Sequence, residues 1–356
     1  MLARVFVATG ILACGLLPFS ASVAVNAPGE SCTKPGEVLP LGAGSIECVN
    51  GVWAPSSKQA NGSGSTGQPG APTTPPTNAP GGSPAAPDKA AAVARIFKPV
   101  GVVESQATFG SSSKQVADPS ALRLADGRIR LYSWVAPTGL RSATSTDASG
   151  LRFVADPSIP LSTMAGQPRI VRLDGSTVRL FFTSSGGVSS AISHDNGLTF
   201  TDEGTVITTA QAGFEPGVIT VIRQGGNYRA YFSNLEKPGV HAERIMKTAT
   251  SPDMLHWTIG SQLRMSGSHP FALTDGKGKV ALYYSTDRGS SYGIFASTSS
   301  DGINFKNEQF ILAGGGDADI VSTGKNSWIM YYGGQVSAVD GFGILAAKSI
   351  GNAIPK

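Results

Sequence analysis

Cysteine, charge and helical patterning are all scarce in this sequence. Of 356 residues, 3 are cysteine and 15% are charged. The 28 basic and 24 acidic residues are spread along the chain, without the clustered Lys and Arg that nucleic-acid binding needs. No useful stretch has a 3.6-residue apolar period, and no Ser-His-Asp signature, phosphate-binding loop or zinc spacing is present. We therefore expect an all-β protein without a nucleic-acid partner.

The first 24 residues have the pattern of a secretory signal peptide. A short basic region with Arg4 precedes a long apolar stretch, and Ser22-Val23-Ala24 offers a small-x-small cleavage site. A membrane anchor is an alternative, although Pro18 and Ser20 interrupt the apolar run. Lipidation at Cys14 is another. We expect a secreted protein, extracellular, periplasmic or displayed at the cell surface, with no membrane span after signal removal.

Two segments, a small cysteine-containing module and a linker, separate the signal from the main domain. Residues 31–54 contain Cys32 and Cys48, which predict a disulfide in an oxidising compartment. Asn50-Gly51 suits a hairpin turn, so this segment is expected to be a small β-module, with Trp53 packing on it or stacking on a sugar. Residues 55–93 are rich in Pro, Gly, Ser and Thr and predict a flexible linker.

One pattern recurs five times between residues 94 and 356. The segments ADPSALRL, GQPRIVRL, FEPGVITV, SHPFALTD and GDADIVST are each followed by a turn and an aromatic-rich strand such as RLYSWV or RAYFSN. Their spacings of 49, 48, 54 and 48 residues are typical of propeller blades or solenoid repeats. A β-sandwich is the rival interpretation, but it does not explain the repeat. We predict a five-bladed β-propeller of four-stranded antiparallel blades.

The ends of the repeat region predict how the ring closes. The fifth copy ends after its third strand, in FGILAAKSIGNAIPK, whereas RIFKPVGVVES before the first copy has the pattern of a fourth strand. An N-terminal strand completing the last blade would leave no open edge in the ring. The turns STDASGLRF, SHDNGLTF, SPDMLHW and SSDGINF are expected to use their aspartates structurally. These are Asp147, Asp195, Asp253 and Asp301.

Aligning the five copies on proline produces a column of polar residues at the start of each first strand. The first strand of a propeller blade lies nearest the axis, so we expect the column to surround a common binding site. Asp319 follows two residues after the last member. The column consists of Asp118, Gln167, Glu215, His269 and Asp317.

These segments resemble the five-bladed propeller glycoside hydrolases, chiefly the arabinanase and β-xylosidase family 43. The resemblance covers residues 94–356 and rests on ADPS in the first blade, FEPG in the third and the SxDGxxF turns. It implies that Asp118 is the base or nucleophile, that Glu215 is the general acid, and that His269 lies near a central metal ion such as Ca²⁺. No cofactor is otherwise required.

One position departs from the family pattern. The family's second blade carries an Asp that tunes the acid, and this chain has Gln167 there. Arg169 favours ionised carboxylates nearby, whereas burial beside Phe214 would raise the pKa of Glu215. Asp317 or Asp319 could replace the missing carboxylate. The predicted substrate-binding residues are Gln167, Arg169, Phe214, His269, Asp317 and Asp319.

The predicted function is that of a monomeric glycoside hydrolase acting on an oligosaccharide or polysaccharide in an axial pocket. A sialidase-like enzyme is an alternative, because SHDNGLTF fits the Asp-box pattern; five repeats and the lack of an RIP motif argue against it. A non-catalytic sugar-binding or interaction module is another, favoured by the linker and by Gln167.

Overall fold

The structure is a computed structural model that describes residues 38–41, 44–49, 52–56, 96–157, 166–235, 244–288, 291–337, 340–349 and 351–354. The chain divides into two compact units, Met1–Pro80 and Gly81–Lys356. Among the described residues, no helix has the length and apolarity needed to span a membrane.

The first unit contains one three-stranded antiparallel sheet. Its strands are β1 (Val38–Leu41), β2 (Gly44–Val49) and β3 (Val52–Ser56), in the order β1-β2-β3. Val49 pairs with Val52, which confirms the hairpin predicted around Asn50-Gly51. Cys32, the signal peptide and the linker lie outside the described residues, so the Cys32–Cys48 disulfide stays a prediction.

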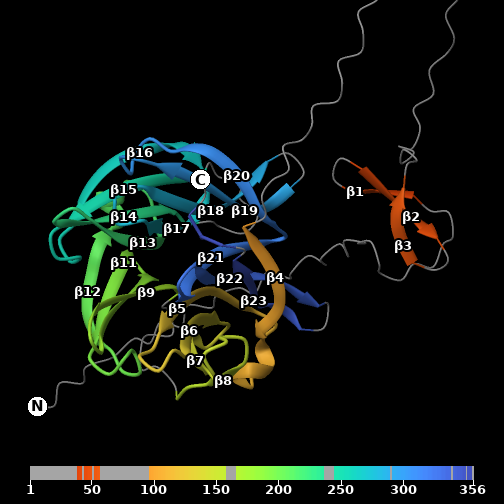
Figure 1. Cartoon of the computed structure of the whole chain (residues 1–356), viewed down its shortest axis with the longest axis horizontal. Coiled ribbons are helices and arrows are strands. Elements are labelled where there is room, and N and C mark those ends of the chain that lie inside the picture. Colours follow the sequence, from red (N-terminus) through yellow and green to blue (C-terminus); the bar gives the residue numbers. More distant parts are fainter. Residues whose placement is uncertain are drawn as a thin grey trace, which may run out of the picture. The chain divides into compact units, whose positions relative to one another are not determined.

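The second unit is a ring of five four-stranded antiparallel sheets (Figure 1), which confirms the predicted propeller. Blade 1 consists of β5 (Val116–Arg123), β6 (Ile129–Val135), β7 (Gly139–Ser145) and β8 (Phe153–Ala155). Blade 2 consists of β9 (Gly166–Asp174), β10 (Thr177–Ser184), β11 (Gly187–Ser193) and β12 (Thr201–Thr208). Blade 3 consists of β13 (Pro216–Gln224), β14 (Asn227–Asn234), β15 (Ile245–Ser251) and β16 (Thr258–Ser266). Blade 4 consists of β17 (Ser268–Thr274), β18 (Val280–Arg288), β19 (Ser291–Ser299) and β20 (Lys306–Ala313).

Blade 5 joins the two ends of the repeat region. Its strands are β21 (Gly315–Gly324), β22 (Ser327–Ser337), β23 (Gly341–Ser349) and, outermost, β4 (Phe97–Glu104). Figure 1 shows the orange β4 beside the blue β23, where Val102 pairs with Leu345. The predicted closure of the ring by a strand from RIFKPVGVVES is therefore confirmed for Phe97–Glu104. Short helices η1 (Gln106–Phe109) and α1 (Thr209–Ala212) precede blades 1 and 3.

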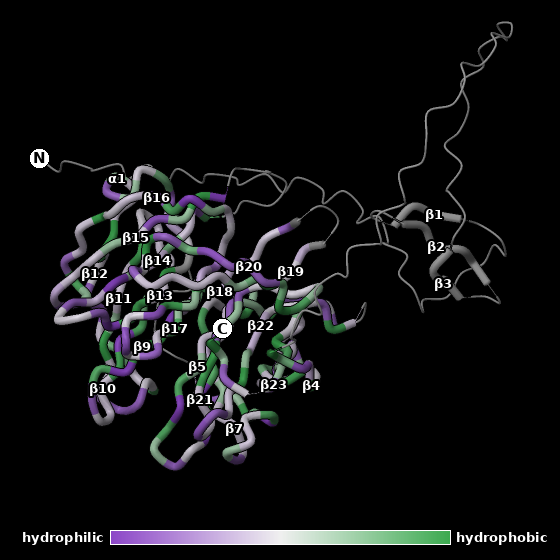
Figure 2. Tube along the Cα trace, turned by 45° about the horizontal axis from the view of Figure 1, so that its top comes forward, coloured by the Kyte–Doolittle hydropathy of each residue, from purple (hydrophilic) through white to green (hydrophobic). Residues whose placement is uncertain are grey.

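The core consists of the packed faces of neighbouring blades. Hydrophobic and hydrophilic residues intersperse along the strands (Figure 2), because each strand turns alternate side chains towards the next blade. Every junction between blades contains one edge-to-face aromatic pair, a geometry that favours aromatic packing. The pairs are Phe200–Tyr132, Trp257–Phe181, Phe305–Tyr231, Phe97–Tyr283 and Phe153–Tyr331, with ring centroids 5.7–6.4 Å apart.

The turns between third and fourth strands have the predicted structural role. In blade 2, Asp195 accepts hydrogen bonds from the backbone N–H groups of Leu198 (2.9 Å) and Thr199 (3.0 Å). These bonds hold the pKa of Asp195 below its usual range, although partial burial opposes them. The carbonyl of Gly197 in the same turn accepts a hydrogen bond of 2.8 Å from Tyr132 of blade 1. The turn therefore connects two blades.

Candidate functional site

Strand pairing aligns the five first strands and corrects the column in blade 3. Ser120 pairs with Tyr132, and Thr220 pairs with Tyr231 at the same place in its blade. Both hydroxyls accept a hydrogen bond from the first strand of the adjacent blade, from Ile170 N at 2.9 Å and Ala272 N at 3.1 Å. Asp118 lies two residues before Ser120.

The residue two positions before Thr220 is Val218, so Val218 and not Glu215 is the blade 3 member of the column. Proline misaligned the copies because it occurs at two kinds of place. Pro119 follows the column inside a bulge, whereas Pro216 is the first residue of its strand and pairs with Asn234. Neither position requires a backbone N–H that donates a hydrogen bond to the next strand, so proline is tolerated at both. Proline alone therefore does not distinguish the two positions.

The other four column residues share an unusual backbone. All have positive φ, between 46° and 59°, a region that non-glycine residues rarely occupy. Each lies at a register shift between the first and second strands, that is, at a β-bulge that redirects a side chain. Strained backbone of this kind concentrates at functional sites. The four residues are Asp118, Gln167, His269 and Asp317.

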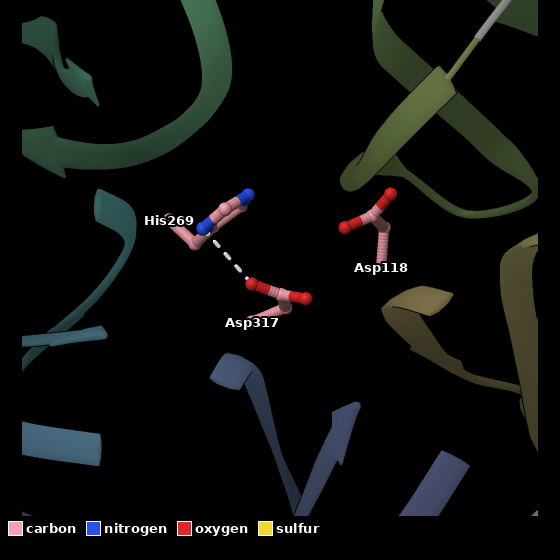
Figure 3. Close-up of side chains that lie close together, drawn as sticks. All are labelled: Asp118, His269 and Asp317. Atoms are coloured by element: carbon pink, nitrogen blue, oxygen red, sulfur yellow. Dashed lines mark ion pairs between the residues drawn. The ribbon is translucent and has the colours of Figure 1, made fainter. Parts of the chain in front are cut away.

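Three of these side chains converge at the axis (Figure 3). One ligand atom each of Asp118, His269 and Asp317 lies within 4.8 Å of the others. His269 Nδ1 is 2.9 Å from Asp317 Oδ1, and His269 Nε2 is 3.0 Å from the Gln167 amide nitrogen. Gln167 of blade 2 thus contacts His269 of blade 4 directly. Four of the five predicted ring residues are therefore brought together.

The charges in this cluster favour different protonation states for its two carboxyl groups. Burial and the neighbouring Asp317 raise the pKa of Asp118 above its usual range, and His269 and Arg169 oppose this only in part. The pKa of Asp317 is lowered despite its burial, because His269, Asp118 and Arg169 all stabilise its ionised form. Two close carboxyl groups that hold one proton between them are the expected result.

Arg169 and Asp319 lie one layer deeper than the column and form a buried ion pair. Arg169 Nη1 is 2.6 Å from Asp319 Oδ2, which also accepts from Ser120 Oγ at 3.0 Å. The guanidinium carbon lies 5.2 Å from the ring centroid of Phe271. Both charged residues are buried, so their place suits support of the site from below rather than contact with a ligand.

Glu215 and Phe214 are separate from the cluster. Glu215 is exposed, and its carbonyl accepts from Leu235 N at 2.8 Å, as the carbonyl of Gln115 accepts from Ala136 N in blade 1. It thus lies three residues before Val218, at the entrance end of the first strand. Phe214 packs against Phe232, with ring centroids 5.9 Å apart.

Glycines close to the column were not singled out by sequence, although they shape the site. A Cβ at Gly333 would lie 3.3 Å from Asp317 Oδ2, and one at Gly217 would lie 3.1 Å from Gln167 Oε1. Because glycine has no Cβ, the Asp317 carboxylate and the Gln167 amide can occupy these positions. In a chain with 45 glycines, composition alone does not identify such places.

The cluster fits a divalent cation. Two carboxylates and the amide oxygen of Gln167 are oxygen donors of the kind that Ca²⁺ prefers, whereas an imidazole nitrogen is more typical of a transition-metal site. Gln167 Oε1 is buried and has no hydrogen-bond partner among the described residues. A buried oxygen without a partner, on a side chain that contacts His269, is a group that a cation could satisfy.

The fold and the axial cluster define a five-bladed propeller with a polar site at one end of its first strands. No protein-family model and no curated protein sequence matches the chain. Solved structures do match, and they include five-bladed glycoside hydrolases of family 43, so the predicted resemblance is confirmed at the level of fold.

Three of these structures illustrate the likeness. A thermostable family-43 glycoside hydrolase has 15% identity and a TM-score of 0.50, over 65% of this chain and 88% of the other. An endo-1,4-β-xylanase from Bacteroides thetaiotaomicron has 14% identity and a TM-score of 0.52, over 65% and 89%. A family-43 β-xylosidase/α-arabinofuranosidase from a compost metagenome, in complex with xylotriose, has 16% identity and a TM-score of 0.51, over 72% and 96%.

Proposed function

We propose that the propeller binds a glycan at the axial cluster and hydrolyses a glycosidic bond. The observation that carries the proposal is the convergence of Asp118, His269 and Asp317, three polar side chains on strained backbone at the same end of three first strands. We also propose that the protein is secreted, as its N-terminal sequence predicts, and that it meets the glycan outside the cytoplasm.

Hydrolysis of a glycosidic bond needs two carboxyl groups on opposite sides of that bond, roughly 5–9.5 Å apart. Asp118 and Asp317 are too close to straddle it, so they count as one functional group of the site. Glu215 is the proposed second group. Glu215 lies three residues before Val218, the blade 3 member of the column. Three residues of extended chain span at most about 10 Å. In this arrangement Glu215 gives the leaving oxygen its proton, and Asp118 activates water or attacks the sugar.

The remaining residues have supporting roles in this proposal. Arg169 and His269 favour the ionised form of Asp118, which a base or nucleophile requires. Asp118, His269, Asp317 and Gln167 would hold a divalent cation, which when bound supplies positive charge to orient sugar hydroxyls. A cation held there should raise the thermal unfolding temperature of the wild type. Asp317→Asn should remove that rise. Comparing the rise with Ca²⁺ and with Zn²⁺ tests which kind of donor set the cluster offers.

The proposal is tested with aryl arabinosides, xylosides, galactosides and sialosides, and binding is measured in parallel. Glu215→Gln should lower turnover of a substrate with a poor leaving group by about 10²–10⁴-fold, and that of an activated aryl glycoside much less. Asp118→Asn should abolish both. Asp202→Asn, an exposed carboxyl on the outermost strand β12, is the matched control. Turnover that survives both Asp118→Asn and Glu215→Gln would refute the glycosidase proposal.

A second candidate is glycan binding without catalysis. The blade 3 position of the column is valine in the sequence, Val218, where the resemblance implied a carboxylate, and Gln167 supplies no charge in blade 2. Saturable sugar binding that Asp118→Asn abolishes, with no turnover by the wild type of any aryl glycoside or oligosaccharide, would support this candidate over the hydrolase.

A further inference from the structure

The third strands of the blades share a position at the rim of the axial site. In blades 3, 4 and 5, the second-strand residues Ser233, Ser285 and Gly333 lie directly beside the column and pair with Met246, Ile294 and Ile344. The residue two positions before each of these third-strand residues is the rim residue of that blade. The rim residues are Thr138, Gly186, Arg244, Tyr292 and Phe342, in blade order.

Tyr292, the rim residue of blade 4, lies against the strand that carries Asp317. The hydroxyl of Tyr292 lies 2.7 Å from where a Cβ of Gly316 would be, and Gly316 immediately precedes Asp317. Ser285 Oγ borders the same point at 3.0 Å and accepts a hydrogen bond of 2.9 Å from Asp317 N. Tyr292 therefore crosses from blade 4 to the first strand of blade 5, beside the column.

The rim residues of the two neighbouring blades are also held in place. The guanidinium carbon of Arg244 lies 5.9 Å from the Tyr292 ring centroid, and Arg244 Nη1 is 2.6 Å from Asp287 Oδ1. Phe342 is held at its backbone, where its N–H donates to the carbonyl of Lys114 at 2.9 Å, just before blade 1. The surface formed by Arg244, Tyr292 and Phe342 is called the rim wall below.

The rim wall is chemically unlike the rest of the exposed surface. Tyr292 and Phe342 are 41% and 49% exposed, and they are the only aromatic residues among the strongly exposed large hydrophobic side chains of the described chain. Exposed aromatic rings that are fixed in place match the apolar faces of sugar rings, and adjacent charged groups can bond sugar hydroxyls. The rim residues of blades 1 and 2 are the small Thr138 and Gly186, so the wall is one-sided.

We infer that the rim wall is a second sugar subsite, which makes an oligosaccharide, rather than a monosaccharide, the ligand of this propeller. One sugar unit occupies the axial cluster, and the following units of a trisaccharide stack on Tyr292 and Phe342, with Arg244 and Asp287 beside Tyr292. The inference rests on the proposed glycan binding at the axis, but it does not depend on whether the bond is cleaved.

The test measures binding of xylo-, arabino- and manno-oligosaccharides of one to six units by titration calorimetry. The wild type should bind a trisaccharide of one series at least about tenfold more tightly than its monosaccharide. Tyr292→Ala and Phe342→Ala should each weaken trisaccharide binding by about 3- to 10-fold, the usual range for one aromatic contact, and leave monosaccharide binding unchanged.

Three further variants keep the outcomes separate. Tyr292→Phe keeps the ring and should bind like the wild type; Leu198→Ala removes an exposed apolar side chain from a turn of blade 2 and should also have no effect. Asp118→Asn should weaken monosaccharide and trisaccharide alike. Loss of binding in Asp118→Asn but in neither rim variant refutes the rim wall and leaves the proposed function standing. A wild type that binds no member of the panel refutes both.

Discussion

We expect Glu104 to make the closure of the ring sensitive to pH. It is the last residue of the closing strand β4, it is fully buried, and Ser133 Oγ of blade 1 donates to its Oε2 at 2.7 Å. The other oxygen, Oε1, has no hydrogen-bond partner among the described residues. Burial raises the pKa of Glu104 from 4.5 to about 8, and the Ser133 hydrogen bond opposes this only in part.

The direction of the effect follows from proton uptake. Between pH 4.5 and about 8 the folded protein keeps a proton on Glu104 that the unfolded chain has lost, so stability falls as pH rises through this window. At about 1.4 kcal/mol for each pH unit, the loss reaches roughly 3 kcal/mol at pH 7 and levels off above pH 8. Relaxation of the blade junction would reduce this figure, so it is an upper limit.

Glu104→Gln removes the titration and keeps the shape. We expect the variant to resemble the wild type near pH 4.5 and to become increasingly more stable than it by pH 8, because the neutral amide can still accept from Ser133. Urea unfolding of the full chain at pH 4.5, 6, 7 and 8 measures the difference. Glu203→Gln is the control, since Glu203 is paired with Arg179 at 2.8 Å and its loss should destabilise near neutral pH. A pH-independent difference between Glu104→Gln and wild type would refute the reasoning.

Three shorter predictions concern the architecture. Gly197→Ala should lower the free energy of unfolding by about 2–3 kcal/mol, because Gly197 has positive φ and its new Cβ would collide with the Tyr132 hydroxyl. Gly225→Ala, where φ is also positive but the space is open, should lower it less. Deleting residues 94–105 should abolish the cooperative unfolding transition, because blade 5 loses its outer strand and Phe97; a retained transition would contradict the closure. Limited proteolysis should cleave first between residues 56 and 92, and equal resistance along the chain would count against a linker.

The sequence by itself determined the architecture of the propeller. Repeats of about 50 residues with a turn and an aromatic-rich strand specified five blades, and a spare fourth strand before the first copy specified the closure. These predictions succeeded because they depend on local chemistry that recurs. The turn aspartates bond to their own backbone, and β-branched and aromatic residues favour pleated strands wherever they occur.

Tertiary structure decided which residues meet at the axis. The alignment on proline placed Glu215 in the column, and only strand pairing showed that Val218 has that position. The position of a residue along a blade depends on which residue of the neighbouring strand it pairs with. Arg169 was expected at the site, but its partner Asp319, 150 residues away, holds it one layer below. The rim wall likewise takes Arg244, Tyr292 and Phe342 from equivalent positions in three blades, and the contact of Arg244 with Tyr292 arises only when those blades pack side by side.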